Sequence, residues 1–313
     1  MNQPSRPTPV NTRFFWVPPG LRTALRPPVE SSLLFAERHR SPPPDYGLPD
    51  GIRRVYLYHV RKTGGTSLSR SFLALAGEDP SAVEQRIAAS FLGTATSGNY
   101  VFAGNRRRAL ESGRYFFGWS HFPAHAVRLP SDTFTVLVLR DPVERAISYY
   151  NYLVAGDDAS VVWAVKDWER RLSEGGFHAF LDRVPKQHLL RQLYMFSSRF
   201  DVDEAADGLR NCSLILTSER LDAELAELND RLGLRLEPRR ERVTSVKAEL
   251  NAAELDRLRS LLEPEYEMFE NVGLTTAGPP NTTAVSPAAA PGTDQEAEHD
   301  DRQDLERRTG SGQ

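Results

Sequence analysis

Six consecutive residues near the start of the sequence combine the groups that proteins use to bind phosphate. Lysine supplies a mobile positive charge, threonine and serine supply hydroxyl donors, and glycine lets the backbone approach an anion closely. An apolar run precedes them and a helical pattern follows, so amides at a helix N-terminus add to the site. The residues are Lys62, Thr63, Gly64, Gly65, Thr66 and Ser67. They predict a phosphate-binding loop; a solvated strand–turn–helix corner is the alternative.

The residue order in this loop differs from that of nucleotide triphosphatases. Their loop reads G-x-x-x-x-G-K-[ST], with the lysine after the glycines. Here Lys62 precedes Gly64 and Gly65, and position 59 holds a histidine where that loop would have its first glycine. We also find no strand-ending aspartate in surroundings typical of a magnesium site. The pattern favours a nucleotide whose reaction needs no magnesium ion, and we expect no metal site.

A second group of residues suited to phosphate lies near position 140. Arg140 follows the apolar run Phe134–Leu139, and Pro142 opens a predicted helix in which Ser148 lies about two turns from the start. A guanidinium group matches phosphate oxygens, and a hydroxyl adds a further donor. Taken alone, Arg140 is also consistent with a helix cap or with a salt bridge to Glu144.

The elements that must position these residues alternate between strands and helices. The patterns predict strands at 54–60, 115–117, 134–139 and 214–217, and helices at 66–75, from 142, at 160–172, 186–196, 221–232 and 248–269, the last one with a possible interruption at Pro264. Trp163 and Trp168 are assigned to the core. This alternation predicts an α/β fold with a central, mostly parallel sheet flanked by helices. Such sheets bind ligands at the carboxyl ends of their strands.

Composition separates a central domain from two tails. Eleven of the 22 prolines lie in residues 1–50, and residues 275–313 are rich in small and acidic residues, so both ends are predicted to be largely disordered. Residues 51–274 have the size of one α/β domain. Residues 51–150 contain thirteen basic and seven acidic side chains, a net charge of +6 in a chain whose total is −3. A basic segment of this kind favours an anionic ligand.

Composition also excludes several classes of protein. With 40% hydrophobic and 26% charged residues the chain is typical of a globular protein, and its longest apolar runs are far shorter than a membrane span. One cysteine, Cys212, excludes a disulfide framework and a cysteine-based metal cluster. The N-terminus lacks the apolar core of a secretion signal. We therefore expect a cytoplasmic protein without a membrane span, and no nucleic-acid partner.

Both motifs resemble those of a known enzyme family. The stretch His59–Leu68 is similar to the 5′-phosphosulfate loop of sulfotransferases that use 3′-phosphoadenosine 5′-phosphosulfate (PAPS). The nearest branch contains carbohydrate sulfotransferases of the heparan 2-O type and their bacterial relatives, which often have proline at the position of Arg61. The second motif resembles the family's 3′-phosphate element, where residues matching Arg140 and Ser148 hold the 3′-phosphate. The resemblance covers about residues 52–273 and implies the P-loop-containing nucleotide-binding fold of sulfotransferases.

Sulfuryl transfer to an alcohol needs a base for the hydroxyl and a cation for the leaving phosphate. Lys62 is the natural cation. Among seven histidines, His121 stands out because it follows an apolar stretch between the two motifs, where related carbohydrate sulfotransferases carry a G-H-x motif whose histidine is the base. A buried, hydrogen-bonded histidine is the alternative for His121, and His125 or a carboxylate are alternatives for the base.

Two further segments are weaker candidates. The region of Arg191, Gln192 and Tyr194 falls where relatives often show an N-x-Q-x-R-like stretch near acceptor and cofactor. Thr244, Ser245 and Lys247 fall where relatives have a loop that closes over the phosphates. For this second segment the alternative is a helix N-cap, at Ser245 or at Asn251.

The resemblance thus implies a PAPS-dependent sulfotransferase with His121 and Lys62 as catalytic residues. Its PAPS-binding residues would be Lys62, Thr63, Gly64, Gly65, Thr66, Ser67, Arg140, Ser148, Ser245 and Lys247. The expected acceptor is a hydroxyl of a carbohydrate, a glycolipid or another glycosylated molecule. A P-loop kinase or another nucleotide-dependent transferase, and a non-catalytic nucleotide-binding protein, are the alternatives.

Overall fold

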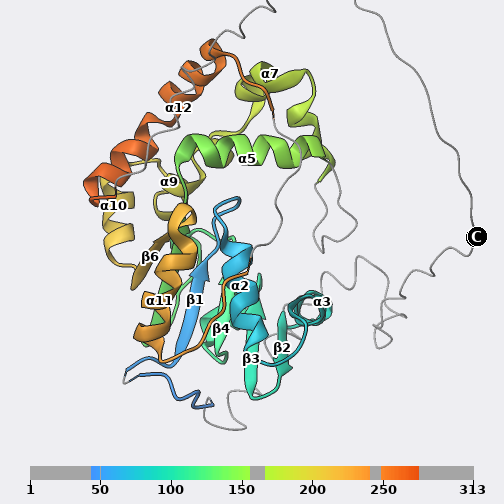
Figure 1. The fold of residues 1–313 in the computed structure, drawn as a ribbon, viewed down its shortest axis with the longest axis vertical. Helices are drawn as coiled ribbons and strands as arrows, with labels where there is room; N and C mark the ends of the chain where they lie inside the picture. Colours follow the sequence, from blue (N-terminus) through green and yellow to red (C-terminus); the bar gives the residue numbers. More distant parts are fainter. Residues whose placement is uncertain (1–43, 50, 156–165, 240–247, 275–313) are drawn as a thin grey trace, which may run out of the picture. The chain divides into compact units, whose positions relative to one another are not determined.

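A six-stranded sheet forms the centre of the computed structural model, which describes residues 44–49, 51–155, 166–239 and 248–274 (Figure 1). The strand order is β2-β3-β4-β1-β5-β6. The strands are β1 (Arg54–Tyr58), β2 (Thr94–Ser97), β3 (Tyr100–Gly104), β4 (Phe117–Ser120), β5 (Thr133–Leu139) and β6 (Leu214–Thr217). All neighbours pair in parallel except β2, which runs antiparallel to β3 at one edge. The predicted α/β class with a mostly parallel sheet is confirmed.

Helices cover both faces of this sheet. In the described part they are α2 (Gly65–Ala74), α3 (Pro80–Ala89), α4 (Arg107–Ser112), α5 (Pro142–Ala155), α6 (Asp167–Arg170), α7 (Gly176–Arg183), α8 (Lys186–Leu189), α9 (Arg191–Phe196), α10 (Val202–Arg210), α11 (Leu221–Leu232) and α12 (Ala252–Asn271), with short 3-10 turns η1 (Ala124–Ala126), η2 (Arg171–Ser173) and η3 (Ser218–Arg220). Among the described residues, no helix combines the length and the apolar character needed to cross a membrane.

The alternation of side chains along the strands explains the two layers of helices. Val55 and Leu57 of β1 point into a core with α2, α3 and α11, whereas Tyr56 between them joins a cluster on the opposite face with α4. In β5, Val136 belongs to the first core and Leu137 to another that contains α5, α9, α10 and α12. Successive residues of a strand face opposite sides, so a strand covered on both faces is apolar throughout.

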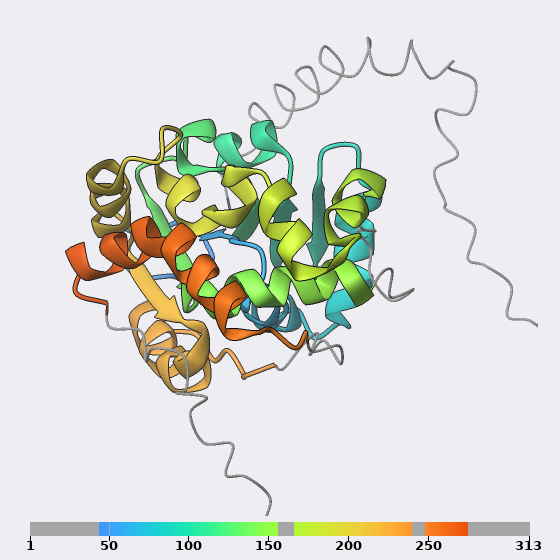
Figure 2. The same cartoon turned by 90° about the horizontal axis from the view of Figure 1, so that it is seen from above.

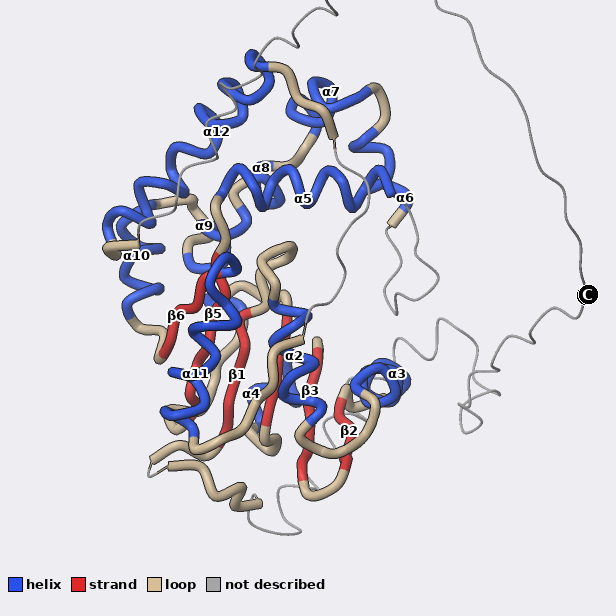
Figure 3. Tube along the Cα trace, viewed as in Figure 1, coloured by secondary structure: helices blue, strands red, loops and turns tan. Residues whose placement is uncertain are grey.

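Helices α5, α7, α9 and α12 gather beyond the carboxyl ends of the strands (Figures 1 and 3). Helix α12 packs against α5, α7, α9 and α10, and in the view from above it lies beside α5 (Figure 2). Loops that leave the strands at this edge therefore lie between the sheet and a second group of helices.

Several element boundaries differ from the sequence prediction. The strand predicted at 54–60 ends at Tyr58, because the chain turns into the loop there. The helix predicted at 186–196 is two short helices, α8 and α9, broken at Leu190, whose backbone (φ −92°, ψ 54°) is not helical. Helix α12 begins at Ala252, where Asn251 accepts a hydrogen bond from the Glu254 amide as its N-cap, and it continues through Pro264 without a break. The alternative N-cap at Asn251 is thus confirmed.

The helix predicted at 160–172 is only partly within the described residues. From Lys166 onward the chain forms α6 and the 3-10 turn η2 rather than one continuous helix. The core assignment of Trp168 is wrong, because 43% of its surface is exposed. Its ring lies tilted against that of His188 at a centroid distance of 5.3 Å, and the His188 ring in turn stacks on Tyr149. Trp163 lies outside the described residues.

Candidate anion-binding site at the ends of the parallel strands

The loop between β1 and α2 has a backbone that directs amide groups outward from the strand ends. Lys62 (φ 72°) and Gly64 (φ 92°) both adopt left-handed conformations, and Gly64 is the N-cap of α2. Amides at a helix start lack intrahelical acceptors. In α2 these belong to Gly64, Gly65 and Thr66, because the Ser67 amide already donates to the Gly64 carbonyl at 2.9 Å. A turn of this geometry, with the helix dipole behind it, can bind an anion.

Thr63 shapes this loop from within. Its side chain is fully buried, and its hydroxyl donates to the Val60 carbonyl at 3.1 Å. The expectation that this hydroxyl contacts an anion is therefore not supported by its orientation. Thr66 and Ser67, by contrast, are only half-buried at the start of α2, where their hydroxyls can face a ligand.

Gly65 is required because the His59 ring packs directly on its α-carbon. A methyl group added at Gly65 would lie 2.8 Å from His59 Nε2, too close for real atoms. Gly65 lies in helical conformation at the first position of α2. Space, rather than backbone angle, thus selects glycine at this position.

We expect Gly65→Ala to destabilise the protein although alanine favours helices. Alanine gains about 1 kcal/mol over glycine inside a helix, but overpacking a buried site costs about 1–3 kcal/mol. Urea unfolding should therefore show a lower free energy of unfolding. In a His59→Ala background the same substitution should no longer lower the free energy of unfolding. Equal destabilisation in both backgrounds would contradict the proposed contact.

His121 follows β4 and lies beside the same loop. Its ring centroid is 4.5 Å from that of His59, and its Nδ1 is 2.6 Å from the His59 carbonyl oxygen. A carbonyl can only accept a hydrogen bond, so Nδ1 carries the proton in the neutral ring and the lone pair lies on Nε2. The Asn105 side chain accepts a hydrogen bond from the His121 amide at 3.3 Å. His121 is thereby held in the tautomer that a general base needs.

Arg140 brings the second motif to the same place. β1 and β5 are adjacent parallel strands, so their carboxyl ends lie side by side. Arg140 Nη1 lies 3.4 Å from the Lys62 carbonyl oxygen, and Nη2 lies 3.4 Å from Glu144. The salt bridge with Glu144 given as an alternative for Arg140 is therefore present together with the contact to the loop. The Arg140 side chain remains 28% exposed.

Three more arginines, Arg61, Arg145 and Arg191, lie near Arg140 and the loop. Arg61 forms an ion pair with Glu169 of α6, and its guanidinium lies 5.4 Å from the Tyr149 ring centroid. Arg191 donates to the His121 carbonyl at 2.6 Å. Burial, and then the charges of Arg61 and Arg145, lower the pKa of Arg191 to about 10. Positive charges that repel one another in this way would be stabilised by a ligand that carries several negative charges.

Negative groups near this cluster are committed to protein partners. Burial would raise the pKa of Glu169, but the adjacent Arg61 guanidinium holds it below the usual value. Asp141 accepts from the Glu144 amide at 2.9 Å and from the Tyr266 hydroxyl at 2.9 Å. It therefore caps α5. The described residues contain no group of three or more His, Cys, Asp or Glu side chains arranged for a metal ion.

The remaining predicted residues differ in their placement. Ser148 lies on α5 one turn beyond Glu144, and therefore on the same face of that helix as Glu144. His125 is exposed in η1, and its ring contacts Tyr194 at a centroid distance of 5.7 Å. Thr244, Ser245 and Lys247 lie outside the described residues.

No protein-family model matches this sequence, and a search of curated proteins finds no match either. The arrangement of the side chains is therefore the basis for assigning a function.

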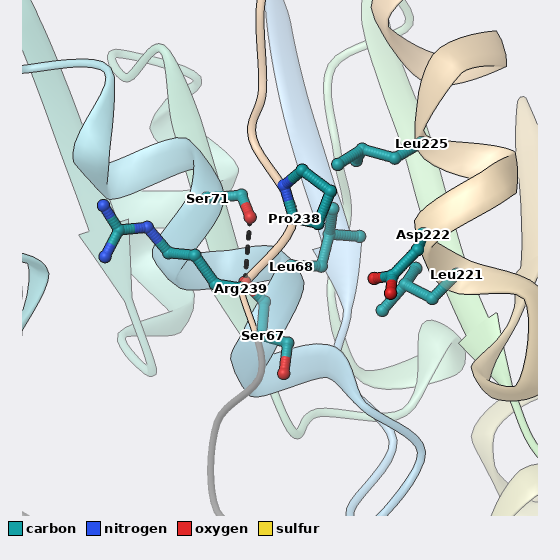
Figure 4. A pocket seen from close by; sticks show the side chains of 8 residues that line it. All are labelled: Ser67, Leu68, Ser71, Leu221, Asp222, Leu225, Pro238 and Arg239. Atoms are coloured by element: carbon teal, nitrogen blue, oxygen red, sulfur yellow. Dashed lines mark hydrogen bonds between the residues drawn. The ribbon is translucent and has the colours of Figure 1, made fainter.

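A small pocket opens next to the candidate site (Figure 4). It lies between α2, α11 and the segment that follows α11, and is lined by Ser67, Leu68, Ser71, Leu221, Asp222, Leu225, Pro238 and Arg239. Its empty volume of about 190 Å³ includes space that is open to solvent. Ser67 belongs to both the pocket and the loop, so the pocket extends the site along α2.

Sequence reasoning missed several residues that build the site. His59, which the patterns placed in the strand at 54–60, is buried but follows β1, and its carbonyl accepts a hydrogen bond from His121. Asn105 comes from the end of β3, a strand that the patterns did not predict. No local pattern identifies His59 as the neighbour of Gly65, and the contact is recognised only once the fold is known.

Proposed function

We propose that this protein is a PAPS-dependent sulfotransferase that transfers a sulfuryl group to an acceptor hydroxyl, on a P-loop-containing nucleotide-binding fold. The acceptor class that we propose is a carbohydrate or another glycosylated molecule. This class is supported by the resemblance of the two motifs to carbohydrate sulfotransferases.

The observation that carries the proposal is the contact between the two motifs. Arg140 lies 78 positions from Lys62, yet its guanidinium reaches the Lys62 carbonyl at 3.4 Å. A loop that offers helix amides and a lysine thus adjoins an arginine on the neighbouring strand. This pair of anion-binding groups suits a nucleotide that carries phosphate at two positions, as PAPS does.

Within this proposal each residue has a defined chemical task. PAPS supplies the sulfuryl group, bound through an S–O bond to its 5′-phosphate. His121 Nε2 takes the proton of the acceptor hydroxyl, whose oxygen forms a new S–O bond while the bond to the phosphate oxygen breaks. Lys62 neutralises the charge that develops on that leaving oxygen. The products are the sulfated acceptor, 3′,5′-ADP and a proton on His121.

The position of Lys62 fits this task. Its ammonium lies 4.7 Å from the centroid of the Tyr152 ring, and Lys62 precedes the N-cap of α2 by two positions. Because the lysine side chain is flexible, rotation about its single bonds would let the ammonium leave the ring face and meet an anion at the loop. Tyr152 comes from α5, the helix that also carries Ser148.

Turnover in the presence of PAPS tests the proposed function. The full chain is incubated with sulfur-labelled PAPS and fractionated cell extract, and mass spectrometry identifies what gains sulfate. A sulfated product formed without added divalent metal supports the proposal. Tight 3′,5′-ADP binding without any sulfated product favours a non-catalytic nucleotide-binding protein, and ATP turnover that depends on magnesium favours a kinase.

Arg140→Ala should weaken 3′,5′-ADP binding by about 1.5–3 kcal/mol, the size of a lost hydrogen bond to a charged group. Isothermal titration calorimetry measures this difference directly. Arg108→Ala is a matched control, because Arg108 is an exposed arginine of α4 in the same basic segment. Equal affinities of the Arg140→Ala and Arg108→Ala variants would remove Arg140 from the site.

A further inference from the structure

The start of α9 is attached to both halves of the candidate site. Arg191, its first residue, donates to the carbonyl of His121 at 2.6 Å. Gln192, its second residue, is fully buried and contacts the backbone of Arg140. Two consecutive side chains therefore link the candidate base to the candidate phosphate ligand.

The Gln192 side chain pairs with both backbone groups of Arg140. Its Oε1 accepts from the Arg140 amide at 2.9 Å, and its Nε2 donates to the Arg140 carbonyl at 3.0 Å. An amide side chain offers one acceptor and one donor side by side, so it pairs with Arg140 as another peptide group would. This contact fixes the backbone where β5 ends and Arg140 leaves the sheet.

Glu265 of α12 holds Gln192 in turn. This carboxylate is fully buried, and Oε1 accepts from the Gln192 amide at 2.7 Å and from the Leu193 amide at 3.2 Å. Its Oε2 accepts from Gln192 Nε2 at 3.0 Å. Glu265 thus caps the first turn of α9. It also fixes the orientation of the Gln192 side-chain amide, because Oε2 can only accept a hydrogen bond and therefore requires Nε2 of Gln192, not Oε1, to face it.

We propose that Glu265 is a positioning residue that sets the place of Arg140 in the anion site through Gln192. The identity of the anion, 3′,5′-ADP or PAPS, rests on the proposed function. The positioning itself rests only on the hydrogen bonds that connect Glu265 to Gln192 and Gln192 to Arg140.

The variant Glu265→Gln separates this role from helix capping. Its remaining oxygen can still accept from the Gln192 and Leu193 amides. The new side-chain amino group at position 265 would face Gln192 Nε2, so two hydrogen-bond donors would oppose each other. Rotating the Gln192 amide to relieve that conflict would place Nε2 against the Arg140 amide, a second donor pair. The disturbance therefore reaches Arg140 while the cap of α9 is kept.

Hydrogen exchange of single amides, followed by NMR in the full chain without ligand, tests the positioning. Glu265→Gln should speed exchange at the Arg140 amide about tenfold or more while Gln192 and Leu193 change less than about threefold. Glu263→Gln removes a charge from an exposed position of the same helix and serves as the control. Unchanged exchange at Arg140 in Glu265→Gln would overturn the proposal, as would equal loss of protection at all three amides.

A double-mutant cycle on 3′,5′-ADP affinity tests the consequence for the site. Glu265→Gln should raise the Kd about five- to tenfold in the wild-type background and less than about twofold in the Arg140→Ala background. Equal changes in both backgrounds would show that Glu265 does not act through Arg140. If the wild-type chain does not bind 3′,5′-ADP, the proposed function fails, and the exchange experiment still decides whether Glu265 positions Arg140.

Discussion

His121→Ala should lower sulfuryl transfer from PAPS by about 10²–10⁴-fold, the usual contribution of a general base. The physical reason is the hydrogen bond from His121 Nδ1 to the His59 carbonyl oxygen, 2.6 Å away. Because this bond keeps the proton on Nδ1, Nε2 is the basic atom of the ring. Affinity for 3′,5′-ADP should stay within about twofold, because the ring is not among the groups proposed to hold phosphate. The transfer rate is measured with the acceptor found in the extract, and the affinity for 3′,5′-ADP is measured by calorimetry.

His125→Ala is the matched control for this experiment. His125 lies four positions further along, is exposed, and contacts Tyr194 rather than the loop. It should retain wild-type turnover. If His125→Ala loses activity and His121→Ala keeps it, the base is misassigned. If both remain active, a carboxylate takes the proton.

Lys62→Ala should lower kcat by about 10²–10³-fold, the effect of removing one group that stabilises charge in a transition state. The ammonium is proposed to neutralise the leaving phosphate oxygen, and that charge develops fully only as the S–O bond breaks. The loss should therefore appear in kcat more than in KM. Steady-state rates at varied PAPS concentration separate the two parameters.

Lys186→Ala is a suitable control, because its ammonium lies 4.5 Å from the Phe200 ring centroid, a cation–π contact like that of Lys62 with Tyr152. Loss of such a contact alone should leave kcat unchanged. Lys62→Gly adds a test of the backbone, since glycine adopts the observed φ of 72° freely. It should be as inactive as Lys62→Ala. Wild-type rates in either Lys62 variant would remove the lysine from the reaction.

The local patterns of the sequence predicted much of the fold and the contact between the two motifs. An apolar run such as 134–139 forms a strand buried on both faces, and parallel strands that lie next to one another bring their carboxyl ends together. This is why Lys62 and Arg140 could be expected in one site. Ser67 and Thr66 follow from the same reasoning, because they belong to the first turn of a helix that the glycines introduce.

The rest of the site depends on contacts between elements that no local pattern records. Gln192 and Glu265 are 73 positions apart, and only the packing of α12 on α9 makes one the partner of the other. The break at Leu190 has the same origin, since the α9 amides find their acceptor on another helix. β2 was missed because it is a four-residue edge strand made of threonine, alanine and serine. β3 is apolar and lies between β2 and β4, and no predicted strand covered it. Trp168 was assigned to the core on helical spacing, which the short α6 does not sustain.

The ion pair between Arg61 and Glu169 restricts how this sequence can evolve. Glu169 is 3% exposed, so it tolerates burial only with a cation beside it. Proline, which the resembling enzymes often carry at the position of Arg61, would leave that carboxylate, among the described residues, without a cation and with only the Tyr149 hydroxyl and the Lys166 amide as donors. Either substitution made singly is thus harmful, and the two positions must change together. Among sequences related to this one, proline at position 61 should accompany an uncharged residue at position 169.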